Sequence, residues 1–111
     1  PSMTRTPDEI FDEVASRYLQ REGVDIGPMF GSAGLRIRGK VFAFQGYQGG
    51  LIAKLPEARV TELDSGGRAQ RMTMRERAMR EWVFVGADAA DLWPTVIDEA
   101  FAFVDEITPR D

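Results

Sequence analysis

The sequence predicts an α+β protein in which helices pack on an antiparallel β-sheet, in the order α-β-β-β-α-β-β-α. Apolar residues recur at helical spacing near both ends of the chain, whereas short alternating segments and glycine-rich turns fill the middle. Strands joined by such short connections must be antiparallel. Since 111 residues is the length of one domain, we expect a single domain over residues 4–108 with flexible ends at residues 1–3 and 109–111.

The first helix is expected to begin at a capping motif. Thr6 can cap the helix, Pro7 suits the first helical position, and Glu9 completes a capping box. Helical spacing continues to residue 21, and Gly23 ends the helix. The apolar residues that share one face are Ile10, Phe11, Val14, Tyr18 and Leu19.

Residues 27–44, GPMFGSAGLRIRGKVFAF, could form a phosphate-binding loop or a β-hairpin. A phosphate loop places its glycines between a strand and a helix N-terminus, whereas Gly39 joins two alternating segments, so we predict a hairpin. A type II′ turn at Gly39-Lys40 would pair Ile37 with Phe42. The side chains then expected on the core-facing side are Leu35, Ile37, Phe42 and Phe44.

The second half of the chain supplies the remaining elements. We expect a strand over residues 51–55, then a short helix that Pro56 opens and Gly66-Gly67 ends. Residues 68–80 fit a short strand or an extended turn, and residues 81–85 a clear strand. Pro94 is tolerated only in a first helical turn, so the last helix should begin near residue 91.

Two tryptophans and a group of methionines are candidates for the core. We expect Trp82 and Trp93 to be buried, with Trp93 near the edge. The methionines Met72, Met74 and Met79 would either fill the core beneath a loop or form an adaptable surface for a partner.

The residue inventory argues against an enzyme. The chain has no cysteine and no histidine, which excludes disulfides and thiolate catalysis and removes the commonest general base and metal ligand. Carboxylate pairs at residues 98–99 and 105–106 occupy adjacent helical positions and are expected to be solvated. We therefore expect no catalytic residue, no cofactor and no metal site.

The charge distribution is uneven. The net charge of −4 comprises −3 over residues 1–26, +5 over residues 27–87 and −6 over residues 88–111. The basic middle could bind nucleic acid or an acidic partner, or it could balance the acidic helices within the molecule. The candidate patch consists of Arg36, Arg38, Lys54, Arg68, Arg71, Arg75, Arg77 and Arg80.

Three segments resemble one family. Residues 29–44 (MFGSAGLRIRGKVFAF), 51–67 (LIAKLPEARVTELDSGG) and 79–93 (MREWVFVGADAADLW) together resemble the TfoX N-terminal domain family, which is similar to the wider YjbR-like group of small α/β domains. The resemblance spans about residues 10–104. It implies an antiparallel sheet with helices packed on it.

The resemblance also implies a function. TfoX-like proteins regulate natural competence genes through other proteins, and YjbR-like relatives are described as candidate DNA-binding proteins. No catalytic set carries over. The larger competence regulators have a second, C-terminal domain, whereas this chain ends at Asp111. A Pro-Phe-containing stretch that we expect after Gly66-Gly67 is replaced by RAQRMTMR.

The sequence thus predicts a non-catalytic interaction or regulatory module with a protein partner. The alternatives are a weak, sequence-nonspecific nucleic-acid-binding domain that uses the arginines, and a small-molecule-binding domain. No helix-turn-helix or zinc pattern supports sequence-specific readout. No apolar run approaches the ~20 residues that span a bilayer, so we expect a cytoplasmic location and no membrane partner. Exposed strand edges leave a homodimer open.

Overall fold

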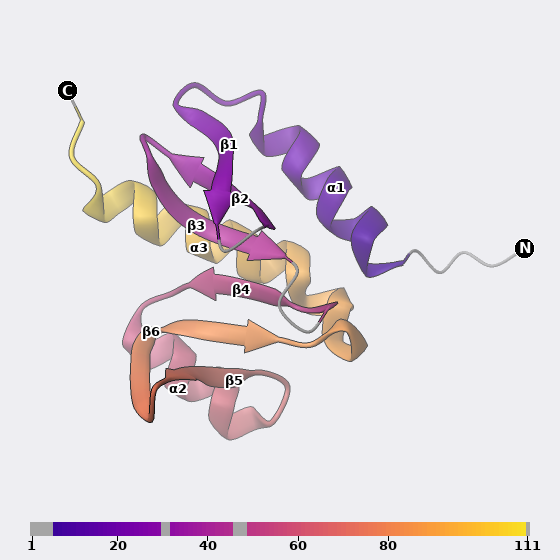
Figure 1. Cartoon of the computed structure of the whole chain (residues 1–111), viewed down its shortest axis with the longest axis vertical. Helices are drawn as coiled ribbons and strands as arrows, with labels where there is room; N and C mark the ends of the chain where they lie inside the picture. Colours follow the sequence, from indigo (N-terminus) through magenta and orange to yellow (C-terminus); the bar gives the residue numbers. More distant parts are fainter. Residues whose placement is uncertain (1–5, 30–31, 46–48, 111) are drawn as a thin grey trace, which may run out of the picture.

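A computed structural model describes residues 6–29, 32–45 and 49–110. The expected fold class is confirmed: a six-stranded antiparallel sheet, in the order β1-β2-β3-β4-β6-β5, carries three α-helices (Figure 1). The helices are α1 (Pro7–Tyr18), α2 (Glu57–Gly66) and α3 (Trp93–Ile107), preceded by the short 3₁₀ helix η2 (Ala87–Leu92). The strands are β1 (Val24–Met29), β2 (Ser32–Ile37), β3 (Lys40–Gln45), β4 (Leu51–Lys54), β5 (Gln70–Met74) and β6 (Arg77–Val85).

The start of α1 and the end of α2 form as the sequence predicts, whereas α1 ends at Tyr18 rather than near residue 21. The Thr6 hydroxyl accepts the Glu9 amide, and the Glu9 carboxylate accepts the Thr6 amide, which completes the capping box. Gly67 ends α2 in the left-handed conformation, with φ of 80°. In the last helix Pro94 lies within the first turn of α3, which begins at Trp93.

Strand β1 precedes the three strands expected in the first half of the sheet, and the sequence analysis did not assign it. It contains Gly27 and Pro28, two residue types that are depleted in strands. Because β1 is an edge strand, Pro28 need not donate to a second neighbour. The segment therefore forms a strand without a strand-like composition.

The predicted register of the β2–β3 hairpin was wrong. Arg38 and Gly39 form the turn, with φ of 48° and 85°, as a type I′ turn requires, and Ile37 pairs with Lys40 rather than Phe42. Between the pairs of Leu35 and Arg36 on β2 the register shifts, because Phe42 is the extra residue of a bulge on β3. After the bulge, the residues of β3 are displaced by one position relative to the predicted register, so Phe44 lies on the face of the sheet opposite to the one predicted.

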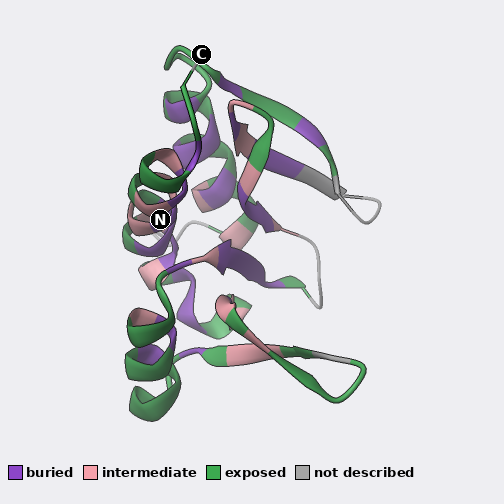
Figure 2. Cartoon of the chain, turned by 90° about the vertical axis from the view of Figure 1, so that its left-hand side faces the viewer, coloured by how far each residue is buried: buried purple, intermediate pink, exposed green. Residues whose placement is uncertain are grey.

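The helices cover one face of the sheet (Figure 2). The Phe42 ring lies 5.7 Å from that of Tyr18 on α1 and 5.4 Å from that of Phe101 on α3. Trp93 is fully buried, and its indole N–H donates to the Val85 carbonyl at 3.2 Å. Trp93 thus lies in the centre of the core rather than near its edge.

No helix of the described residues covers the other face of the sheet (Figure 2). Phe44, Ile52 and Phe84 are cross-strand neighbours on this face. Trp82 lies there as well, only half-buried, with its ring 6.4 Å from that of Phe44. The expectation that Trp82 belongs to the core was therefore wrong.

Some of the sequence-based predictions concern residues that the structure does not describe. The end segment 1–3 and residue 111 are among them, as are residues 46–48 of the glycine-rich turn after β3. No helix in the described part of the chain is long and apolar enough to cross a bilayer.

Candidate interaction surface

The eight basic side chains of the candidate patch do not form one surface. Arg36 on β2 makes a bidentate pair with Asp25 on β1, with Nε–Oδ1 and Nη2–Oδ2 distances of 2.9 and 2.7 Å. The hydrogen bonds from Arg36 hold the pKa of the Asp25 carboxyl below its usual value. This pair is exposed and ties the edge strand to its neighbour.

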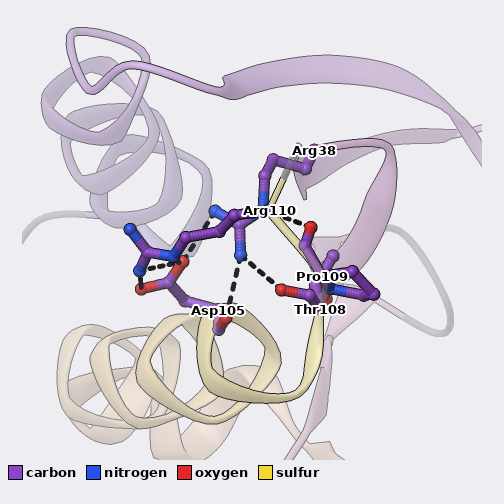
Figure 3. A network of polar contacts seen from close by, with 5 residues as sticks. All are labelled: Arg38, Asp105, Thr108, Pro109 and Arg110. Atoms are coloured by element: carbon purple, nitrogen blue, oxygen red, sulfur yellow. Dashed lines mark hydrogen bonds and ion pairs between the residues drawn. The ribbon is translucent and has the colours of Figure 1, made fainter.

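Arg38 binds the end of the last helix. Its guanidinium donates to the Asp105 carboxylate at 2.8 Å and to the main-chain carbonyls of Asp105, Thr108 and Pro109 at 2.8, 2.9 and 3.1 Å (Figure 3). The last carbonyls of a helix lack partners within it. Arg38 therefore caps α3 from the β2–β3 turn.

Three further members of the patch contact nearby groups. Arg68 donates to Asp91 at 2.8 Å, and Arg71 donates to the Thr61 hydroxyl and to the Glu57 carbonyl of α2. Lys54 lies 3.9 Å from the Glu81 carboxylate. With Arg36 and Arg38, five of the eight cations thus serve contacts within the molecule.

Arg59 on α2 is a cation that the sequence analysis did not single out. It donates to Glu99 of α3 at 2.7 Å and also contacts Glu62. These hydrogen bonds raise its pKa. The spacing of three residues between Arg59 and Glu62 was visible in the sequence, whereas the partner forty residues away was not.

The remaining three arginines lie on a two-stranded ribbon, residues 72–80, which we call the hairpin arm. β4 pairs with residues 82–85 of β6, so residues 77–79 pair with β5 alone. The arm extends away from the helices, and exposed residues cover its tip (Figure 2). Its turn consists of Arg75 and Glu76, whose φ values of 51° and 65° fit a type I′ turn.

The arginines of the arm are open to solvent. Arg75, Arg77 and Arg80 are exposed, and none has a hydrogen-bond or ion-pair partner among the residues that the structure describes. Met72 and Met79 face each other across the ribbon and are half-buried. The arm therefore combines unpaired positive charge with partly exposed thioethers.

The acidic residues of the last helix are held by neighbours from other elements. Asp98 accepts the Tyr18 hydroxyl at 2.6 Å, Glu99 pairs with Arg59, and Asp105 pairs with Arg38. Burial and the adjacent Asp98 carboxylate raise the pKa of Tyr18. Within the described ranges, no group of three acidic side chains is arranged to hold a metal ion.

No protein-family model, curated protein or solved structure matches this chain.

Proposed function

We propose that this chain is a non-catalytic interaction module of the TfoX N-terminal type, and that its hairpin arm binds an acidic segment of a partner protein. The observation that carries the proposal is the division of the basic side chains: five make contacts inside the molecule, and three on one projecting ribbon have no partner among the described residues. Unpaired arginines on a ribbon are available to carboxylates without the loss of an internal contact.

The composition and position of the arm support a protein partner. Arginine and methionine are enriched in protein interfaces, and the half-buried Met72 and Met79 would supply apolar contact area beside the charges. β5 is an edge strand of the sheet, so an extended segment can add to it by main-chain hydrogen bonds. The absence of cysteine and histidine from the sequence supports a role without catalysis.

Nucleic-acid binding by the same arm is the second candidate. Arg77 lies on the same side of the ribbon as Met79, because side chains alternate along a strand, whereas Arg80 follows the pair of Met79 with Met72, where the register shifts. Exposed arginines on a ribbon can contact the phosphates that border a groove, and the major groove admits a two-stranded ribbon. Three arginines on a chain of net charge −4 would support only weak binding.

Fluorescence anisotropy can test the proposal with two labelled probes, a peptide of alternating glutamate and valine and a short DNA duplex. The test variant is Arg77→Gln/Arg80→Gln. The matched control is Arg17→Gln/Arg110→Gln, which removes the same charge from exposed positions outside the arm.

We expect the peptide to bind with a dissociation constant of about 100 μM or tighter, and the test variant to weaken it at least about tenfold. The control variant should bind like the wild type. Equal losses in the two variants, or no peptide binding at low salt, would contradict the proposal. Nucleic acid would be favoured instead if the duplex binds more tightly than the peptide and if duplex binding weakens about 40-fold between 50 and 200 mM salt, as three phosphate contacts predict.

A further inference from the structure

Both lysines of this chain line the same pocket. The sequence contains fourteen basic residues, of which only Lys40 and Lys54 are lysines. Lys40 begins β3 and Lys54 ends β4, so the antiparallel arrangement brings them to the same end of the sheet. There they border a pocket of about 280 Å³ that is also lined by the end of α3.

The lining of this pocket is apolar apart from the lysines and one hydroxyl-bearing residue. The indole of Trp82 forms part of one wall, and Val104 and Ile107 of α3 also line the pocket. Thr108, which is only 8% exposed, is a buried polar residue at the same site. A mostly apolar pocket with a few convergent polar groups is the usual form of a small-molecule site.

The positive charge at this pocket is incompletely neutralised. Lys54 Nζ is 3.9 Å from the Glu81 carboxylate, at the limit of an ion pair, and 5.8 Å from the centre of the Trp82 ring. Lys40 has no ion-pair partner within the described part of the chain. The Lys40 ammonium group is therefore available to an anion, and Lys54 can bind one while its long contact with Glu81 is kept or exchanged.

The end of α3 would normally repel an anion, because helix C-termini carry partial negative charge. Arg38 removes this obstacle, since it donates to the terminal carbonyls and to the Asp105 carboxylate (Figure 3). Arg110 donates to the same carboxylate. The pocket is thus bordered by a helix end where the Asp105 carboxylate and three main-chain carbonyls already have partners.

We propose that this pocket binds a small carboxylate with an aromatic or branched apolar body. The ammonium groups of Lys40 and Lys54 bind the carboxylate, and the indole of Trp82 packs against the body. The volume lies just below the ~300–1,000 Å³ of typical ligand sites, which favours a ligand smaller than a nucleotide. This site is separate from the hairpin arm, so it stands or falls independently of the proposed function.

The lysines themselves provide the assay. Reductive methylation with ¹³C-formaldehyde keeps their charge and places an NMR-visible label on each lysine nitrogen and on the chain's amino terminus. The labelled protein is titrated with 3-phenylpropanoate and, separately, with its uncharged amide. Lys54→Gln removes one pocket charge, and Arg80→Gln is the matched control with a charge removed from the arm.

We expect saturable shifts of both lysine signals and of the Trp82 indole N–H signal, with a dissociation constant of about 1 mM. The amide should bind at least about tenfold more weakly, because it lacks the charge-assisted bonds. Lys54→Gln should weaken the carboxylate about tenfold and leave the amide unchanged, whereas Arg80→Gln should leave both unchanged. The absence of saturable shifts, equal affinity of the two probes, or an equal loss in Arg80→Gln would overturn the proposal.

Discussion

Replacement of Arg38 by methionine tests the role of this side chain in holding the sheet to the last helix. The change removes four hydrogen bonds, one to the Asp105 carboxylate and three to main-chain carbonyls at the end of α3. At about 1–1.5 kcal/mol each they sum to about 4–6 kcal/mol. The freed side chain no longer loses its rotamer entropy, which returns up to about 2 kcal/mol. We therefore expect Arg38→Met to lower the free energy of unfolding by about 3 kcal/mol.

Urea unfolding followed by tryptophan fluorescence measures this loss, which corresponds to a fall in Tm of about 10–15 °C for a domain of this size. Arg36→Met is the matched control on the same strand, since its pair with Asp25 is exposed, and it should change the midpoint much less. Arg38→Gly should lose about 1 kcal/mol less than Arg38→Met, because glycine tolerates the φ of 48°. Equal midpoints for Arg36→Met and Arg38→Met would refute the capping role.

Three further predictions concern stability. The raised pKa of Tyr18 means that the folded state favours the neutral phenol. The stability that this preference contributes below the unfolded-state pKa should therefore be lost as pH rises above about 10. In alkaline unfolding titrations, Tyr18→Phe should lose less stability than the wild type. Gly50→Ala should destabilise by about 2 kcal/mol or more in thermal unfolding, since a β-carbon would lie 2.6 Å from a phenylalanine ring, whereas Gly66→Ala, with open space around it, should stabilise by about 0.5–1 kcal/mol. Arg75→Asn/Glu76→Gly, which gives the turn its preferred residues, should stabilise the protein by about 1 kcal/mol in urea unfolding; a loss would mean that the turn is not type I′.

Local signals in the sequence predicted the parts of the fold that depend on neighbouring residues. The capping box at Thr6 and the left-handed Gly67 involve contacts within a few positions, and both form as expected. The register of the β2–β3 hairpin could not be predicted from such local signals, because Arg38 adopts a left-handed conformation that arginine alone disfavours. Its bonds to α3, about seventy residues away, offset that strain.

The candidate surface was predictable in composition but not in arrangement. Sequence reasoning grouped eight basic residues, yet contacts with distant residues decide which of them are available. Arg68, which follows α2, pairs with Asp91 of η2, for example, while Arg77 has no such partner among the described residues. The location of both lysines at one pocket likewise depends on the order of the strands and on the position of α3.

The most direct test of the account is a map of backbone amide NMR shifts during titration with the alternating glutamate–valine peptide. The account predicts that the largest shifts fall on residues 70–80 and saturate together, while the amides of Arg36, Arg38 and Arg68 change little, because those side chains are already bound within the protein. Shifts centred on Arg36, Arg38 and Arg68, with the hairpin arm unchanged, would contradict it.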